Sequence, residues 1–463
     1  MTTEERIRKR KIGVIGMGRS GIAAAVLAAD YGGKPFVSDS NQAEQLVPAI
    51  DTLKQHSIPY ETGGHSDRLL ESDYIVVSPG VSPLIDILQE VASKGIPIFS
   101  EIEFASWVCR GRIVAVTGSN GKTTTTTLIG EILSASGLET YVCGNIGLPF
   151  AQVANKVGEQ AVAVVEVSTF QLERVADFKP YIALILNLSP DHLDRHGSFL
   201  QYKKLKYRIT ENQAAEDFLI LNSDDDEIIS DDVTSSAAKL FFTIEGTTDS
   251  GVFVEDGVLY TIYRSRKSRI IDSSDILIPG LHNFQNAAAA TAAAMMFNIQ
   301  PDTIENVLKT FPGVEHRLER VDRVAGIEFI NDSKATNINS VCWALQSIET
   351  PIYLIAGGRE KGGSFQPLVK CGRNRIKGLV LVGEAKGKMF DALGKDFPTV
   401  FADSLEEAVT KSFELARPGE TVLLSPGCAS FDMFENFEHR GRVFKAAVDG
   451  LKFGNRKNET ISD

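Results

Sequence analysis

Short apolar runs alternate with longer amphipathic stretches along most of the chain. In the first hundred or so residues the runs are Lys11–Ile15, Lys34–Ser38, Tyr74–Ser78 and Ile96–Phe99, and the stretches between them have helical periodicity. Such alternation is typical of a parallel sheet covered by helices. The pattern therefore predicts an α/β fold at the start of the chain.

The same alternation resumes twice. A second block begins with the run Ile113–Val116 and contains the apolar segments AVAVVEV and IALILNL. Residues 235–280 then show short β-like runs separated by DSG and EDG, which predicts an antiparallel insertion. A third block contains GIEFIND, PIYLIAGG, GLVLVGE and TVLLSPG. We predict three α/β domains, 1–108, 109–314 and 315–463, each built on a mostly parallel sheet.

Composition and charge restrict the function. The 463 residues carry a net charge of −12, which argues against a nucleic-acid partner. The five cysteines are scattered without a CxxC pair, so we expect neither a disulfide framework nor a zinc site. The polar start MTTEERIRKRK and the lack of a long apolar run predict a cytoplasmic protein with no membrane insertion. We expect a monomer, with the alanine-rich residues 287–297 in a packed helix.

The turn after Ile113–Val116 has the composition of a phosphate-binding loop. TGSNGKTTTT departs from GxxxxGK[ST] because Val116 stands at the first glycine position. Its glycines still allow successive N–H groups to point at an anion, and a helix from Lys122 to about Ser136 would direct its positive end at phosphates. The alternative is an ordinary strand–turn–helix corner. The residues assigned to ATP here are Gly118, Ser119, Asn120, Gly121, Lys122, Thr123 and Thr124.

Two polar positions near strand ends are candidate magnesium ligands. Glu166 is a carboxylate within the apolar segment AVVEVSTFQLE, and burying it unpaired would cost several kcal/mol by a rough estimate. It therefore requires a cation, either Mg²⁺ or a basic side chain. His192 follows a second strand in SPDHLDRHG, where the cluster of charged residues favours a metal or substrate contact.

The chain also opens with a glycine loop, GMGRSG, between a strand and a helix. Gly16, Gly18 and Gly21 fit G-x-G-x-x-G, and Asp39 ends the next expected strand. This pattern is that of a dinucleotide site, although any nucleotide diphosphate suits a helix amino terminus equally well. From the pattern alone, NAD(P) and another nucleotide remain open.

The motifs taken together resemble the Mur ligases. TGSNGKTTT, GNIG, EVSTFQLE, SPDHLDRHG, LHNFQNAAAA, EHRLE, NDSKATN and LLSPGCASFDMFENFEHRG occur in the order found in that family, and the resemblance covers nearly the whole chain, to about Arg442. NDSKATN is similar to the segment of the D-glutamate-adding members. The DNPR signature of the diaminopimelate- and lysine-adding members is absent from the sequence.

The resemblance implies an activity and a fold. Mur ligases are cytoplasmic, ATP-dependent amide-bond ligases of peptidoglycan precursor synthesis. The implied reaction adds D-glutamate to UDP-N-acetylmuramoyl-L-alanine through an acyl phosphate, giving ADP and phosphate. The implied domains are Rossmann-like at both ends with a P-loop ATPase-like centre, and the first glycine loop then binds the UDP substrate rather than NAD(P). The third domain would have to close over the second to complete the site.

Roles for individual residues follow from the resemblance. Two Mg²⁺ ions are implied, with Thr123, Glu166, His192 and a carbamylated Lys206 as the metal site. Without the resemblance, Lys206 would be interpreted as a surface lysine. Asn283 and Asn286 would be interpreted as helix-cap amides, and Ser430 as a helix cap. The implied catalytic set is Lys122, Glu166, His192, Lys206 and Lys334; further ATP contacts are Asn283, Asn286, Arg317 and Asp332; the UDP-substrate set is Gly18, Arg19, Ser20, Asp39, Ser40, Asn41, Ser78, Gly80, Asn145 and His192; the D-glutamate set is Thr336, Lys361, Ser430 and Phe437.

Three other functions fit parts of the sequence. One is a Mur ligase that adds a different amino acid, which NDSKATN disfavours. Another is an NAD(P)-dependent oxidoreductase joined to a phosphate-loop domain, which leaves Glu166 and His192 unexplained. The third is a nucleotide-binding regulator without catalysis, which the complete set of Lys122, Glu166 and His192 disfavours.

Overall fold

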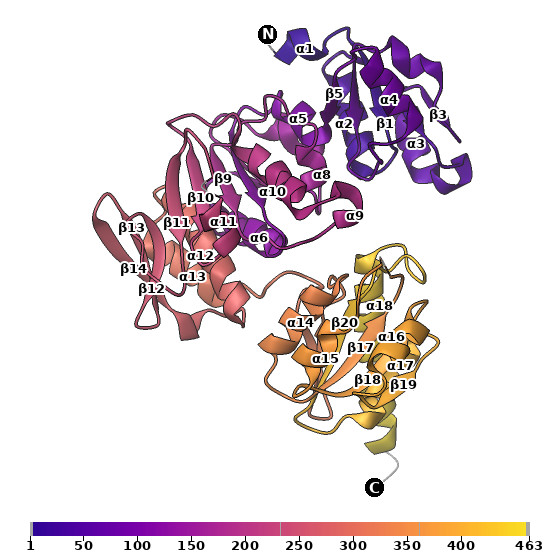
Figure 1. Ribbon diagram of the computed structural model, residues 1–463, viewed down its shortest axis with the longest axis vertical. Coiled ribbons are helices and arrows are strands. Elements are labelled where there is room, and N and C mark those ends of the chain that lie inside the picture. The colour runs from indigo at the N-terminus through magenta and orange to yellow at the C-terminus, as the bar shows by residue number, and fades with distance from the viewer. Residues whose placement is uncertain (1–2, 232, 361, 460–463) are drawn as a thin grey trace. The chain divides into compact units, whose positions relative to one another are not determined.

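The computed structural model describes residues 3–231, 233–360 and 362–459, which form two compact units (Figure 1). Unit one contains Met1–Leu277 and Asn283–Thr310, and unit two contains Ile278–His282 and Phe311–Asp463. Three sheets are present, two in unit one and one in unit two. The predicted α/β class is confirmed. The domain boundaries at 108 and 314 stay predictions, since the first two sheets belong to the same compact unit.

The first sheet is five-stranded and entirely parallel, in the order β3-β2-β1-β4-β5. Four of its strands were predicted. The fifth, β3, was missed because Tyr60–Thr62 is a short, half-buried edge strand with no apolar run. Its elements are α1 (Thr3–Ile7), β1 (Lys11–Ile15), α2 (Arg19–Asp30), β2 (Lys34–Asp39), α3 (Val47–Gln55), β3 (Tyr60–Thr62), β4 (Tyr74–Val77), α4 (Asp86–Ser93), β5 (Ile98–Ser100) and α5 (Glu101–Ser106).

The second sheet has nine strands in the order β14-β13-β12-β11-β10-β9-β6-β8-β7. The antiparallel insertion is confirmed, because β12, β13 and β14 pair antiparallel while the other pairs are parallel. Its strands are β6 (Arg112–Thr117), β7 (Thr140–Gly144), β8 (Val162–Glu166), β9 (Ile182–Ile185), β10 (Phe218–Asn222), β11 (Ala238–Phe242), β12 (Gly251–Glu255), β13 (Val258–Tyr263) and β14 (Arg266–Asp272). The helices are α6 (Lys122–Ala135), α7 (Phe150–Val153), α8 (Thr169–Leu172), α9 (Leu193–His196), α10 (Phe199–Tyr207), α11 (Asp226–Ser230), α12 (Leu281–Met295) and α13 (Pro301–Thr310).

The third sheet has the order β15-β16-β20-β17-β18-β19, and only the edge strand β15 runs antiparallel. Its strands are β15 (Glu319–Val324), β16 (Ile327–Asn331), β17 (Ile352–Gly357), β18 (Ile376–Val382), β19 (Thr399–Phe401) and β20 (Thr421–Gly427). The helices are α14 (Ile338–Ser347), α15 (Pro367–Gly372), α16 (Lys386–Leu393), α17 (Leu405–Leu415) and α18 (Phe437–Glu459).

The alanine-rich segment is a packed helix, as predicted. Residues 287–290 and 292–294 of α12 are alanines that are fully buried. Alanine has the best helix propensity and its small side chain permits close packing. In the described parts of the chain, every helix is too short or too polar to cross a bilayer.

The cysteines depart from the sequence prediction. In unit two the structure bonds Cys342 of α14 to Cys371, whose Cα atoms lie 5.6 Å apart. The sequence argued against a disulfide framework and did not predict this single pair, because the two residues are separated by 29 positions and only the packing of α14 against α15 brings them together. Of the other cysteines, Cys109 is half-buried, and Cys143 and Cys428 are buried.

Helix α5 ties the first sheet to the second within unit one. Glu103 is fully buried, and its carboxylate accepts hydrogen bonds from the N–H groups of Ala176 (2.9 Å), Asp177 (3.0 Å) and Phe178 (2.8 Å). The indole Nε1 of Trp107 donates a fourth at 2.8 Å. Four donors replace the water that a buried carboxylate loses, so Glu103 anchors the 176–178 loop to α5.

Candidate active site

The second glycine loop lies between β6 and α6, as the sequence predicted. Gly118 and Gly121 have φ of +154° and +81°, which side chains rarely tolerate. A Cβ atom at Gly121 would lie 2.3 Å from Asn286 Oδ1. Both glycines are therefore required by the loop, and Asn286 of α12 packs directly against it.

Two lysines converge on one carbonyl of this loop. Lys122 Nζ donates to the carbonyl of Gly118 at 2.8 Å and to that of Ser119 at 3.0 Å. Lys206 Nζ, from α10, donates to the same Gly118 carbonyl at 2.7 Å. Two cations beside a nest of N–H groups at a helix amino terminus make a strongly anion-binding site.

Lys206 is buried rather than on the surface. Only 1% of it is exposed, and its ammonium lies 4.6 Å from the centre of the Tyr202 ring. Burial lowers the Lys206 pKa well below its usual value, and Lys122 lowers it further, while Asp191 and Glu166 oppose the shift. A lysine in this environment has access to its neutral amine form.

The carboxylate of Glu166 ends β8 next to the loop and is 2% exposed. Its Oε2 accepts a hydrogen bond from Thr123 Oγ1 at 2.6 Å, and its Oε1 accepts one from Asn145 Nδ2 at 3.0 Å. Because β6, β8 and β9 are parallel neighbours, the segments after them reach the same edge of the sheet. The carboxylate and the threonine hydroxyl are both oxygen ligands of the kind that Mg²⁺ prefers.

His192 lies after β9, at the same edge. Its backbone is left-handed, with φ of +50°, and its Nε2 is 3.7 Å from Asp191 Oδ2. Its ring packs edge-on against Phe170, at 4.9 Å between centroids. A non-glycine residue held at positive φ is uncommon and strained, which is frequent at functional sites.

The amides Asn283 and Asn286 are buried in the first turns of α12. Asn286 Oδ1 accepts from Thr125 Oγ1 at 3.2 Å, and its Nδ2 donates to Asn283 Oδ1 at 3.3 Å. The four threonines 123–126 are themselves buried, with the hydroxyl of Thr124 lacking a hydrogen-bond partner among the described residues. The structure therefore brings both asparagines to the phosphate loop.

The first glycine loop is organised by Asp39. Its carboxylate accepts N–H bonds from Met17 (2.6 Å) and Asn41 (2.8 Å). Ser78 Oγ donates to the Gly16 carbonyl at 3.2 Å. Gly18 caps α2, and the predicted Arg19, Ser20, Ser40, Asn41 and Gly80 lie at the same edge of the first sheet, at the ends of β1, β2 and β4.

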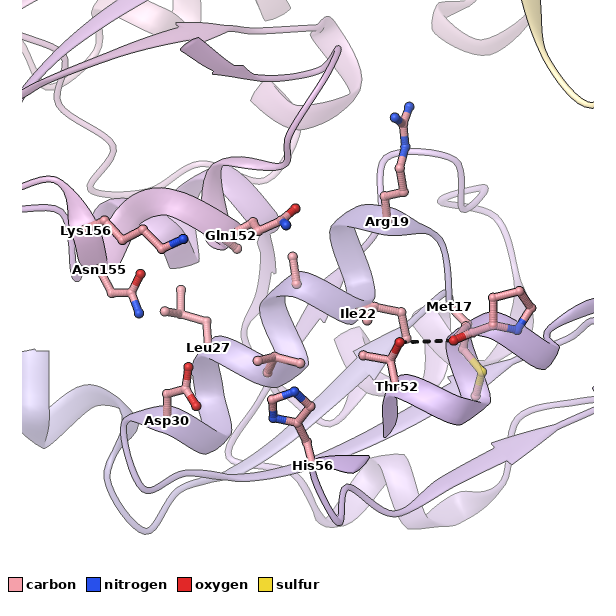
Figure 2. A pocket seen from close by; sticks show the side chains of 15 residues that line it. Met17, Arg19, Ile22, Leu27, Asp30, Thr52, His56, Gln152, Asn155 and Lys156 are labelled. Carbon is pink, nitrogen blue, oxygen red and sulfur yellow. Dashed lines mark hydrogen bonds between the residues drawn. The ribbon is translucent and has the colours of Figure 1, made fainter. Parts of the chain in front are cut away.

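Beside this loop a groove of about 630 Å³ follows the outer face of α2 (Figure 2). Ile22 and Leu27 form its apolar floor, while Asp30 and His56 at one side and Lys156 at the other supply polar groups. Arg19 stands at one end and donates to the Gly147 carbonyl at 3.3 Å. Asn145 belongs to this 145–147 segment, so the first and second sheets meet beside the predicted diphosphate site.

Unit two brings together Arg317, Asp332 and Lys334. Asp332 Oδ2 accepts from Ser425 Oγ at 2.7 Å, and burial raises the pKa of Asp332 to about 6, opposed by Ser425, Arg317 and Lys334. The Arg317 Nε is buried and has no hydrogen-bond partner within the described residues of the unit. An unpaired buried guanidinium nitrogen is expensive and favours an anionic ligand.

The predicted D-glutamate residues also belong to unit two. Thr336 is half-buried before α14, and Ser430 is buried after β20 with its carbonyl accepting from Phe434 N at 2.9 Å. The Phe437 carbonyl accepts from Ser333 Oγ at 2.8 Å. Lys361 lies outside the described residues.

Three segments of this chain match known protein families. Residues 11–87 match the MurD N-terminal domain, 116–294 the Mur ligase middle domain, and 316–428 the Mur ligase glutamate ligase domain. The UDP-N-acetylmuramoylalanine--D-glutamate ligase of Thermoanaerobacter sp. (strain X514) is 42% identical over 451 residues, covering 96% of this chain and 99% of that protein.

The chain belongs to the Mur ligase family. This Mur ligase also shares its fold with UDP-N-acetylmuramate-alanine ligase MurC from Thermotoga maritima, at a TM-score of 0.61 and 18% identity, covering 96% of this chain and 100% of that one. The MurF ligase of Thermotoga maritima in complex with ADP gives a TM-score of 0.59 and 16% identity, covering 97% and 98%. Mur ligases are ATP-dependent ligases of peptidoglycan precursor synthesis, so this chain is an enzyme of that class.

Sequence analysis missed several residues that shape the site of this Mur ligase. Asn187 accepts from Asn120 N (2.8 Å) and donates to the Asn120 carbonyl (3.1 Å), and Tyr202 shares a hydrogen bond of 3.0 Å with Ser119 Oγ. Asn187 is the one polar residue of the predicted strand segment IALILNL, and this was a signal in the sequence that could have identified it. Tyr202 carried none, because its contact depends on how α10 packs.

Proposed function

We propose that this Mur ligase joins D-glutamate to UDP-N-acetylmuramoyl-L-alanine through an acyl phosphate. The supporting observation is the convergence of Lys122 and Lys206 on the Gly118 carbonyl, beside the carboxylate of Glu166. That arrangement suits the transfer of a phosphoryl group between two anions. The 42% identity to a UDP-N-acetylmuramoylalanine--D-glutamate ligase supports the choice of substrates.

The first step is the attack of the substrate carboxylate on the γ-phosphate of ATP. Both groups are anionic, so the site must hold them in line against their repulsion. In this proposal the N–H groups of residues 118–121 and the Lys122 ammonium take the β- and γ-phosphates. The negative charge that spreads over the phosphoryl oxygens is then stabilised by donors already in place.

The oxygens of Thr123 and Glu166, and the ring of His192, fit a divalent cation, and Lys206 would join them if carbamylated. Mg²⁺ bound there would neutralise phosphate charge and orient the oxygens. The lowered pKa of Lys206 supports the carbamate, since carbon dioxide reacts with a neutral amine. The product is an anion whose oxygens can ligate the cation.

In the second step the amine of D-glutamate attacks the acyl phosphate, and phosphate leaves from the tetrahedral intermediate. We propose that Thr336, Lys361, Ser430 and Phe437 hold the two carboxylates of D-glutamate. Arg317 and Lys334 would hold the phosphates and Asp332 the ribose. Because these residues belong to unit two, we infer that the units close on each other during turnover.

We also propose that the protein acts in the cytoplasm, where nucleotide substrates of this kind are found.

The experiment measures phosphate release with ATP, Mg²⁺ and UDP-N-acetylmuramoyl-L-alanine. D-glutamate, L-glutamate, L-alanine and meso-diaminopimelate are added separately. Release that requires D-glutamate, with a product heavier by one glutamyl residue, is expected. Release with another amino acid alone would contradict the proposed specificity, and no release together with tight NAD(P)H binding would overturn the assignment of the first glycine loop.

A further inference from the structure

Glu101, the first residue of α5, is fully buried in unit one. Its Oε1 accepts a hydrogen bond from Ala151 N, in α7, at 2.5 Å. Its Oε2 is fully buried and lacks a partner of hydrogen-bond geometry among the described residues, and the same holds for Nε2 of Gln171. The Gln171 side chain and the Phe150 N–H also stabilise the carboxylate, at longer range. Glu101 thus faces two short helices, α7 and α8.

Each of these helices continues a segment of the candidate active site. Helix α7 follows the loop that carries Asn145, and α8 follows the end of β8, which carries Glu166. Asn145 holds Glu166 with both its side chain (3.0 Å to Oε1) and its backbone N–H (2.8 Å to the carbonyl). Gln171 closes the first turn of α8 by accepting from Ser168 N at 3.0 Å and Ser168 Oγ at 3.1 Å.

Glu103 shows what a purely structural carboxylate looks like in the same helix. It is equally buried, yet four donors surround it, three of them N–H groups of the 176–178 loop and the fourth the Trp107 indole. Glu101 has one donor that meets the geometry of a hydrogen bond, the Ala151 N–H. An under-satisfied buried carboxyl lowers stability, and such groups concentrate at functional sites.

The surroundings of Glu101 determine how it titrates. Burial raises the pKa of Glu101 to about 7, opposed by the Ala151 N–H, the Gln171 side chain and the Phe150 N–H. The buried Cys143 thiol interacts electrostatically with Glu101, and burial raises the pKa of this thiol and of the neighbouring Cys109 thiol. Two other titratable residues belong to the same surroundings: Glu103 in α5 itself, and Tyr74 of β4, whose ring packs against Phe104 of α5. Helices α7 and α8 contain no titratable residue, and the charged ends of α2, Arg19 and Asp30, are exposed.

We propose that Glu101 is a positioning residue that holds Asn145 and Glu166 in the geometry needed for phosphoryl transfer. It acts through α7, which it anchors at Ala151, and through Gln171 of α8. The ionised carboxylate accepts from the Ala151 N–H and is stabilised by the Gln171 amide, whereas a protonated Oε2 would present a hydrogen to that amide, which is also a donor. This inference rests on the proposed function in assigning Glu166 to the reaction.

The test compares Glu101→Gln with Glu103→Gln, a matched control in the same helix. The turnover number of both variants and of the unmodified enzyme is measured from pH 6 to 8.5. We expect the ratio of unmodified enzyme to Glu101→Gln to rise up to about tenfold between pH 6 and 8, as one group of pKa near 7 ionises. The ratio for Glu103→Gln should not change with pH. A flat ratio for Glu101→Gln, or the same slope in both variants, would overturn the proposal.

A second readout does not depend on ligation. Because folding raises the Glu101 pKa above its unfolded value of 4.5, stability from this group is lost as pH rises toward 7. The unfolding free energy of the unmodified protein minus that of Glu101→Gln should therefore fall between pH 5 and 7.5. Affinity for ADP with Mg²⁺, measured over the same pH range, replaces turnover if no ligation is detected. If no ligation is detected but ADP binding depends on pH as expected, only the proposed substrates are rejected. If both ADP binding and the stability difference are independent of pH, the proposed role of Glu101 is rejected.

Should Glu101→Gln fail to fold, Gln171→Met tests the same path from the other side. It removes the amide that faces Oε2 and leaves Glu101 in place. We expect a loss of turnover that is largest above pH 7, where the carboxylate is ionised. A loss that is equal at every pH would contradict the proposal.

Discussion

The glycine loop after β1 and the glycine loop after β6 begin alike, with a buried parallel strand, a glycine at positive φ and a helix that starts at the sheet edge. They differ in what their neighbours contribute. At the first loop, the carboxylate of Asp39 at the end of β2 accepts hydrogen bonds from two backbone N–H groups, that of Met17 in the loop and that of Asn41 after β2. In the second, Lys122 and Lys206 converge on one carbonyl and Glu166 faces Thr123.

This difference explains why the same sequence pattern serves two purposes. A strand, a glycine turn and a helix amino terminus create a place for a diphosphate in both loops. Phosphoryl transfer requires charges held near the transferred group, and the second loop has the buried Glu166 and Lys206 beside it together with Lys122. The first loop is therefore suited to binding and the second to reaction.

Lys122→Ala sharpens this comparison most. It removes the ammonium that, in our proposal, contacts the γ-phosphate in the transition state, so we expect turnover to fall about 10³-fold. Steady-state phosphate release measures it. Lys204→Ala, an exposed lysine of α10, is the control and should retain full turnover. A drop below tenfold for Lys122→Ala would mean that the second loop only binds.

Lys206→Met tests the second lysine beside the same loop. We expect about a 100-fold loss of turnover, because the variant can neither carry a carbamate nor place a charge near Glu166. Removing carbon dioxide and bicarbonate should slow the unmodified enzyme and leave the variant unchanged. If depletion slows neither protein, Lys206 acts as an ordinary ammonium.

Asp39→Asn addresses the first loop. The substitution weakens two charge-assisted hydrogen bonds, to Met17 and Asn41, and we expect KM for the UDP substrate to rise roughly tenfold. KM for ATP should be unchanged, since the second loop is not touched. Equal increases in both constants would erase the distinction between the loops.

Arg19→Ala should have the smallest effect. The side chain is exposed and donates at 3.3 Å to Gly147, so we expect KM for the UDP substrate to rise only about threefold. Added salt should reduce the difference from the unmodified enzyme, because exposed charges are screened. An effect larger than that of Asp39→Asn would show that Arg19 is a principal diphosphate ligand.

Sequence patterns were informative wherever the physical cause is local. Strands with continuous apolar runs, such as β1, β6, β8 and β17, were predicted because parallel strands are buried on both faces, whereas short edge strands such as β3 and β19 were not. Gly118 and Gly121 were predicted because a phosphate loop needs their torsions. The burial of Lys206 was not predictable from QYKKLKYRI, where three lysines differ only in which helix face meets the phosphate loop. Glu101 and the Cys342–Cys371 pair depend on contacts between distant segments.

The four donors around Glu103 have a practical consequence for anyone who divides this gene into fragments. A cut at residue 108, where sequence patterns predict the first domain to end, leaves α5 on one fragment and the N–H groups of residues 176–178 on the other. The first fragment would then keep only the Trp107 donor to Glu103, and would expose this carboxylate together with Ile102 and Phe104, both fully buried in the intact chain. Expression of the first sheet alone should give an aggregation-prone product. A fragment that keeps both sheets of unit one retains the hydrogen bonds between Glu103 and residues 176–178.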